Sequence, residues 1–159
     1  MDWKNLFTSF DRRISRQPFW IGTIILLAID IASEFAFDAF FGEGSPNAVV
    51  RGVIRDLVLL YPNLAIAAKR WHDRDKSGWW SLLVVITFLF EYTTLINYSN
   101  KSRWWHLLWI VPTVASTWYL VECGFLRGTS GPNRFGPDPL SQPGRIAAGR
   151  NIPEDQGES

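Results

Sequence analysis

The chain contains a single cysteine, Cys123, and only two histidines in 159 residues. One cysteine cannot form an intramolecular disulfide, and it cannot by itself provide a thiolate metal site. The sequence has no glycine-rich phosphate loop and no Ser-His-Asp or Cys-His arrangement that would indicate a reaction. A net charge of +1 gives no reason to expect nucleic acid as a partner. We therefore predict no metal site, no cofactor and no catalytic residue.

Long apolar stretches, by contrast, occupy more than half of the chain, at residues 18–41, 53–68, 79–98 and 104–125. Each is about long enough to cross the ~30 Å hydrocarbon core of a bilayer as a helix. The first stretch could be a cleaved signal peptide, but Asp30 interrupts it and no clean cleavage site follows. We predict an all-α membrane protein, a four-span transmembrane helical bundle whose first span is retained.

The predicted bundle leaves no room for a separate soluble module, so residues 1–140 should form one integral membrane domain. Apolar residues recur at helical spacing from Trp3 to Ile14, which predicts an N-terminal interfacial amphipathic helix over residues 2–14. Beyond Leu140 the sequence lacks apolar periodicity, so residues 141–159 are predicted to be a disordered cytoplasmic tail.

Lysine and arginine are concentrated in three short polar segments rich in aromatic residues, at residues 2–17, 69–78 and 126–140. The positive-inside rule places both termini and the middle loop in the cytoplasm. All three segments should then lie on one side of the membrane, where we refer to them together as the cap.

Three carboxylates recur every fourth residue within the first predicted span, at Asp30, Glu34 and Asp38. This spacing places them in one stripe along a helix. A carboxylate near the bilayer centre costs ~2.5 to 3.5 kcal/mol on insertion scales, so the stripe should face protein or water rather than lipid.

Two arginines of the next span are candidate partners for this stripe. Asp38 and Arg51 lie about equally far from the turn near residues 42–47, and Glu34 and Arg55 lie one helical turn deeper. Antiparallel helices would therefore form two ion pairs, whose simplest role is packing.

Asp30 has no partner in this ladder and should lie near the bilayer centre, where Asn63 is a candidate neighbour. It could act as a proton relay, or it could be an inert neutral acid that is hydrogen-bonded to a neighbour. Glu91, on the third span, is another deeply placed carboxylate.

The cap supplies the candidate binding residues Arg13, Arg16, Arg70, His72, Asp73, Arg74, Asn133, Arg134 and Asp138. One histidine beside two acids lacks the spacing of a zinc or iron site, and the neighbouring arginines would repel a cation. His72 could instead serve as a general base, or the charges could simply pair within a tight loop.

The segment after the last span contains too much glycine and proline for regular structure, so we expect an ordered turn that docks on the bundle. Asp138 should meet Arg74 or Arg70, and Arg134 should meet a lipid phosphate or an acidic loop residue. Glu122, near the inner end of the last span, could pair with one of three residues: Lys69, Arg70 or Arg127.

A family resemblance rests on three motifs: Phe10-Asp-Arg-Arg-Ile-Ser-Arg-Gln-Pro-Phe-Trp20, Lys69-Arg-Trp-His-Asp-Arg-Asp-Lys-Ser-Gly-Trp-Trp80 and Gly131-Pro-Asn-Arg-Phe-Gly-Pro-Asp-Pro139. In this order they resemble the domain of unknown function 805 family, the YhaH-type small bacterial inner-membrane proteins, over residues 4–139. The resemblance implies a multi-span helical protein of the bacterial inner membrane and no activity. Arg12 stands where the family pattern has glycine, which favours a continuous helix there over a tight turn.

The leading functional hypothesis is a non-enzymatic interaction protein whose cap binds anionic lipid headgroups or an acidic partner. Each basic residue beside an anionic leaflet gains ~1 kcal/mol. The alternative is a small proton-coupled transporter or channel that uses Asp30, Glu34 and Glu91. A third hypothesis is an intramembrane enzyme that acts on lipid through His72 and Asp73. A second membrane protein or a second copy of the chain is a candidate partner, and nucleic acid is not.

Overall fold

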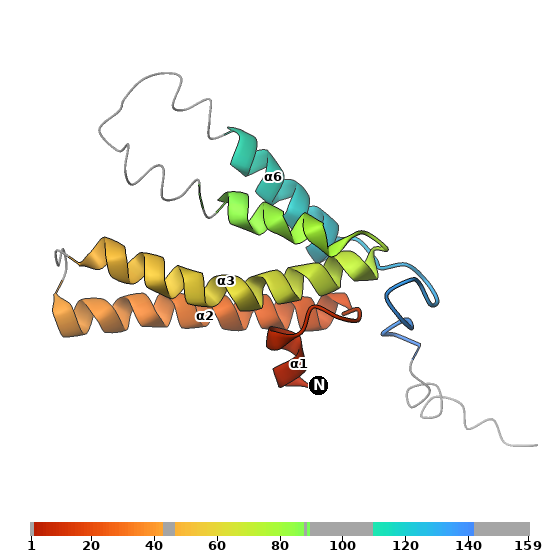
Figure 1. The fold of residues 1–159 in the computed structure, drawn as a ribbon, viewed down its shortest axis with the longest axis horizontal. Coiled ribbons are helices and arrows are strands. Elements are labelled where there is room, and N and C mark those ends of the chain that lie inside the picture. The colour runs from red at the N-terminus through yellow and green to blue at the C-terminus, as the bar shows by residue number, and fades with distance from the viewer. Residues whose placement is uncertain (1, 43–46, 88, 90–109, 142–159) are drawn as a thin grey trace, which may run out of the picture.

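The computed structural model describes residues 2–42, 47–87, 89 and 110–141 (Figure 1). The regular elements of these residues are helices, which confirms the all-α fold class, with one isolated bridge between Asn133 and Gly136. In chain order they are α1 (Trp3–Thr8), α2 (Arg16–Phe41), α3 (Ala48–Asp73), the 3₁₀ helix η1 (Gly78–Ser81), α6 (Ile110–Leu120) and the π-helix η2 (Val121–Phe125). Residues 82–87 are also helical.

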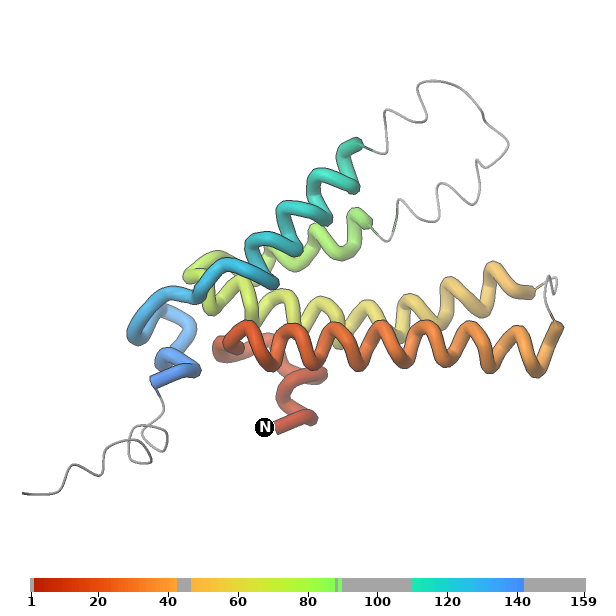
Figure 2. The backbone as a smooth tube through the Cα atoms, turned by 180° about the vertical axis from the view of Figure 1, so that it is seen from behind, coloured from red at the N-terminus to blue at the C-terminus, as the bar shows by residue number. Residues whose placement is uncertain are grey.

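The helices α2 and α3 form an antiparallel pair, and they lie side by side in both views (Figures 1 and 2). The beginning of α2, the end of α3 and η2 meet at one end of this pair, where α1 also packs. The core lies at this end, because every residue from Ala65 to Trp71 is buried and Phe19 and Cys123 pack beside them.

Within the described residues, none of the helices combines the length and the apolar character that crossing a membrane requires. The structure therefore does not show the four predicted membrane spans. The predicted spans 79–98 and 104–125 lie partly outside the described residues, as do Glu91 and the predicted tail from residue 142 onward.

The N-terminal helix is shorter than predicted. α1 ends at Thr8, and the side chain of Asp2 accepts a hydrogen bond from the Asn5 amide to cap its first turn. Arg12 has a φ of 73°, in the left-handed region that glycine adopts most easily. The prediction of a continuous helix over residues 2–14 is therefore wrong, because the chain turns at Arg12 and buries the next side chain, Arg13.

The second long helix extends further than predicted, so residues 69–73 are helix rather than loop. Its end is a Schellman motif: the Lys76 amide donates to the Trp71 carbonyl at 2.9 Å, and the Asp75 amide donates to the His72 carbonyl at 3.0 Å. Asp75 takes the left-handed position with a φ of 57°. This turn places the last side chains of α3 against the other two segments of the cap.

Candidate functional site

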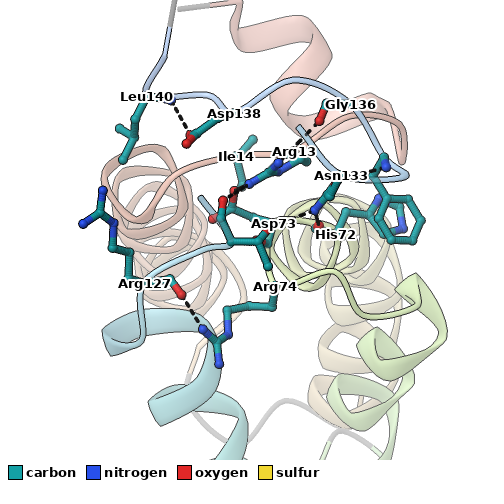
Figure 3. A network of polar contacts seen from close by, with 12 residues as sticks. Arg13, Ile14, His72, Asp73, Arg74, Arg127, Asn133, Gly136, Asp138 and Leu140 are labelled. Carbon is teal, nitrogen blue, oxygen red and sulfur yellow. Dashed lines mark hydrogen bonds and ion pairs between the residues drawn. The ribbon is translucent and has the colours of Figure 1, made fainter. Parts of the chain in front are cut away.

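Asp73, in the last turn of α3, joins all three segments of the cap (Figure 3). Its Oδ1 accepts from Arg13 Nε at 3.1 Å and lies 3.0 Å from Arg13 Nη2, and its Oδ2 pairs with Arg70 Nη1. Its backbone carbonyl accepts from the Thr129 amide at 2.8 Å. All three charged side chains are buried, so this cluster forms an interior polar network.

The remaining donors of Arg13 hold the last segment of the cap. Its guanidinium donates to the carbonyls of Thr129 at 2.6 Å, Gly131 at 2.8 Å and Gly136 at 3.4 Å. The rigid fork of an arginine can satisfy several acceptors at once, which a lysine cannot do in the same geometry. Arg13 therefore replaces the regular backbone pairing that this glycine- and proline-rich segment lacks.

Arg70, which also pairs with Asp73, holds the end of η2. Its Nε donates to the Cys123 carbonyl at 2.6 Å, and its Nη2 donates to the Leu126 carbonyl. Two side chains of α2 complete the arrangement, because Trp20 donates to the Gly124 carbonyl at 3.0 Å and Arg16 donates to the Phe125 carbonyl at 3.1 Å. Four consecutive carbonyls at a helix end, which no further helical turn can satisfy, are thus paired.

Lys69 fastens α1 to α3. Its ammonium donates to the Leu6 carbonyl at 2.8 Å and to the Asn5 carbonyl. Burial lowers the pKa of Lys69 to about 8, although the carboxylates of Asp11 and Asp2 oppose the shift.

Burial also governs the electrostatics around Asp73. It raises the pKa of this carboxyl, and the guanidiniums of Arg70 and Arg13 oppose the shift without cancelling it. Burial lowers the pKa of Arg70 in the same way. The network therefore carries a desolvation cost, and this cost is offset only while the charged partners stay in contact.

Glu122 forms a second buried cluster with residues of the middle segment. Its carboxylate lies 3.2 Å from Arg74 Nη2 and also pairs with Lys76. Arg74 donates in addition to the Arg127 carbonyl (Figure 3). None of the three predicted partners pairs with Glu122 in the described residues, because the turn after α3 brings Arg74 and Lys76 closer.

Asp138 does not pair with Arg74 or Arg70, and that prediction is wrong. Its carboxylate instead accepts from the amides of Leu140 at 2.9 Å and Gly131 at 3.1 Å, which closes the turn between them. These two amides, the Leu140 amide first, lower the pKa of Asp138. This turn chemistry is local, since Asp138 and Leu140 are two residues apart.

Two adjacent residues of the third motif, Asn133 and Arg134, contact the end of α3. Asn133 Nδ2 donates to the His72 carbonyl at 2.9 Å, and Arg134 lies 3.3 Å from the carboxylate of Asp75. Of the two partners predicted for Arg134, the acidic loop residue is the one present. Both groups of the Arg134–Asp75 pair are largely exposed, so this ion pair contributes little to stability.

A pocket of about 370 Å³ opens beside this network, and each of the three motifs contributes to its wall. Phe10 comes from the first motif, His72 and Trp79 from the second, and Phe135 from the third. The imidazole of His72 stacks on the Phe135 ring, with centroids 3.9 Å apart and planes within 9°. The polar network and the pocket together make the cap our candidate site.

A separate polar cluster surrounds Arg55 on α3. The predicted pair between Arg55 and Glu34 is present, but Arg55 Nε also lies 2.9 Å from the carboxylates of Asp30 and Asp56. The prediction that Asp30 has no partner in the ladder is wrong, because Asp30 and Glu34 lie one turn apart and reach the same guanidinium. Asp56 was missed, although its place directly after Arg55 was a signal.

The second predicted ion pair, between Asp38 and Arg51, is not among the ion pairs of the described residues. The guanidinium of Arg51 lies over the rings of Phe41 and Phe37 instead, 4.8 and 5.8 Å from their centroids. Aromatic rings attract a guanidinium by cation–π interaction, and residues 37 and 41 lie one turn apart on the same face.

A cavity of about 350 Å³ adjoins the Arg55 cluster. Asp30, Asp56 and Asn63 line it together with Arg55, so the predicted neighbourhood of Asp30 and Asn63 is present. No group of three or more His, Cys, Asp or Glu side chains in the described part of the chain is arranged to hold a metal ion.

Comparison with known proteins gives a family and several relatives. The profile of the family described as "Protein of unknown function (DUF805)" matches residues 7–98 and 96–137. "Inner membrane protein YhaH" of Escherichia coli (strain K12) is 27% identical over 90% of this chain and 100% of its own. "Inner membrane protein YhaI" is 29% identical (84% and 87%), and "Uncharacterized protein YiiR" is 28% identical (82% and 85%), both from the same organism. No solved structure matches.

Proposed function

Because this chain belongs to the family of proteins of unknown function described as DUF805, we propose that it is a multi-span helical protein of the bacterial inner membrane. Two of its relatives carry the name inner membrane protein. Large apolar side chains on α2 also favour lipid surroundings, because Phe35 is 73% and Phe40 is 85% exposed. In this arrangement both termini and the cap are cytoplasmic.

Reporter fusions test this topology. A green fluorescent protein fused after Ser159 should fluoresce, whereas alkaline phosphatase fused there should be inactive, because the phosphatase folds only outside the cytoplasm. The opposite pattern would place the cap on the outer side and contradict the proposed orientation.

The cap binds anionic lipid headgroups through its exposed arginines in this proposal. The observation that carries it is that Arg12, Arg16 and Arg127 are exposed, and no ion pair among the described residues involves them. Arg13 and Arg70, which are among the binding residues predicted from the sequence, are not part of the proposed lipid-binding surface. Both side chains are buried and donate to groups inside the cap. Three such residues at ~1 kcal/mol each would favour anionic over zwitterionic lipid by on the order of 100-fold.

Native mass spectrometry from nanodiscs of mixed anionic and zwitterionic lipid tests the headgroup proposal. The triple variant Arg12→Gln, Arg16→Gln, Arg127→Gln should lose the enrichment of anionic lipid. The variant Arg103→Gln is the control, since its charge lies on the opposite side in the predicted topology. Unchanged enrichment in the triple variant would refute the proposal, and loss of a co-purifying acidic protein instead would favour a protein partner.

A second candidate function, a proton-coupled transporter or channel, is favoured by the polar cavity beside Arg55. One guanidinium there faces three carboxylates, of which Asp30 and Asp56 line the cavity. Proton flux into liposomes should fall in Asp30→Asn and remain in Asp38→Asn, whose side chain does not line this cavity. Equal flux in the wild type, in both variants and in empty liposomes would exclude this function.

A further inference from the structure

The pocket at the cap is lined mainly by apolar side chains, and its polar side chains are His72, Ser77 and Ser81. Its apolar lining includes the side chains of Leu64, Ala68 and Leu82 and the aromatic rings of Phe10, Trp79 and Phe135. Trp79 is 78% exposed, so this side of the pocket is open. No lysine or arginine lines it, which disfavours an anionic occupant.

One of these polar side chains is the imidazole of His72, whose Nε2 atom lies beside Gly78 in the pocket wall. The other ring nitrogen, Nδ1, lies 3.3 Å from the Arg12 carbonyl oxygen. A carbonyl oxygen can only accept, so Nδ1 carries the hydrogen, and in the neutral imidazole Nε2 presents a lone pair. Burial lowers the pKa of His72, with Arg134 acting in the same direction and the Arg12 carbonyl and Asp11 opposing, so the neutral form prevails at pH 7.

Gly78 keeps the space in front of Nε2 open. A Cβ atom at this position would lie 2.9 Å from His72 Nε2 and 3.3 Å from the Ala68 Cβ. The backbone of Gly78 is not in the left-handed region, so its conformation alone does not require glycine. The missing side chain leaves the lone pair of Nε2 accessible from the pocket.

We propose that this pocket binds the hydroxyl-bearing end of an apolar membrane lipid, whose hydroxyl donates a hydrogen bond to His72 Nε2 while its apolar body lies against Leu64, Leu82 and Phe135. A lone pair in an apolar pocket selects a donor, and an uncharged hydroxyl avoids the desolvation cost of a headgroup charge. Phe135 and Trp79 fit either an aromatic ring or an alkyl chain. The ligand is therefore a quinol or an aliphatic alcohol such as diacylglycerol, and the inference rests on the membrane location proposed above.

Isothermal titration calorimetry of the full chain in mild detergent tests this inference with three probes. They are a short-chain ubiquinol, its O-methylated derivative and a short-chain diacylglycerol. A probe whose hydroxyl reaches His72 should bind about tenfold more tightly than a probe that lacks the hydroxyl. A tenfold difference in affinity is the usual contribution of one buried hydrogen bond. Preference for ubiquinol or for diacylglycerol identifies the source, whereas equal binding of ubiquinol and its methylated form, with no diacylglycerol binding, overturns the inference.

Two isosteric substitutions test the role of His72 separately from its packing. His72→Asn places an amide donor near Nδ1 and removes the acceptor at Nε2, whereas His72→Gln places an amide oxygen near Nε2. The Asn variant should lose about tenfold in affinity and the Gln variant less. Gly78→Ala should reduce binding as well, because its Cβ blocks Nε2.

The headgroup proposal can fail independently of this inference. The triple arginine variant described above should keep its affinity for the hydroxylated probe, since none of the three side chains lines the pocket. Unchanged affinity in His72→Asn would overturn the inference even if anionic lipid enrichment is observed.

Discussion

Arg13 should be essential for the folded cap and dispensable for the rest of the bundle. The substitution Arg13→Met keeps the length and apolar stem of the side chain but removes its guanidinium. In the wild type this group contacts one carboxylate and three carbonyls from the segment after η2. Among the described residues no other side chain contacts all of these acceptors, so the variant leaves the buried carboxylate and the part-buried carbonyls with fewer donors.

The cost follows from the chemistry of buried pairs. Removing one partner of a buried ion pair costs ~3 to 5 kcal/mol, because the other charge stays uncompensated in a poorly solvated place. Arg70 still contacts Asp73 in the variant and offsets part of this loss, which favours the lower end. A local destabilisation of ~3 kcal/mol raises the fraction of open cap by roughly 100-fold.

Hydrogen exchange measured by mass spectrometry in detergent is the appropriate assay. Peptides covering residues 126–138 should exchange on the order of 100-fold faster in Arg13→Met, while peptides from the middle of α2 should be unaffected. Arg12→Met is the matched control, because Arg12 is adjacent, equally basic and exposed. If both variants exchange within about threefold of each other, the buried network does not hold the cap, and our reasoning is refuted.

Three further substitutions test individual features. Arg12→Gly should raise the free energy of unfolding by ~0.5 kcal/mol in chemical denaturation, since relief of the left-handed strain exceeds the added entropy of the unfolded chain; a loss of stability would contradict this. Gly128→Ala should lower the melting temperature, at a cost of about 2 kcal/mol, because its Cβ would clash with the carboxylate of Asp73. Ser130→Ala, at an exposed position, should leave the melting temperature unchanged. Lys69 has a folded pKa of about 8 against 10.5 unfolded, so between these values the unfolded chain binds more protons and stability should rise with pH. The free energy of unfolding, measured by denaturation at several pH values, should rise by at most ~1.4 kcal/mol per pH unit. This rise should disappear in Lys69→Met.

The features that the sequence predicts correctly are those that depend on local periodicity or on a short, regular connection. Helical spacing placed Glu34 opposite Arg55 once the two long helices were taken as antiparallel. The same spacing could not show that one arginine would collect three carboxylates, because this depends on how its guanidinium is turned. Nor could it show that the guanidinium of Arg51 would lie over the rings of Phe37 and Phe41.

The cap was predictable as a location and unpredictable as a network. The motifs marked the three segments that meet there, yet the residues treated as a binding surface divide into buried and exposed groups. Arg13 and Arg70 donate mainly to backbone carbonyls, which every residue possesses, so no residue pattern identifies the acceptors. The turn at Arg12 was missed for a related reason, since the contacts of the folded cap outweigh the backbone preference of a single residue.

The network and the pocket are coupled through the end of α3, and this coupling separates two ways of losing a ligand. Asp73 and His72 are adjacent in sequence, and Asn133 donates to the His72 carbonyl from the segment that Arg13 holds. Arg13→Met should therefore weaken binding of the hydroxylated probe because Phe135 leaves the pocket wall as the cap opens. His72→Asn should weaken the same binding while hydrogen exchange of residues 126–138 stays unchanged. If Arg13→Met opens the cap and the probe still binds as in the wild type, Phe135 and the third segment are not part of the binding site.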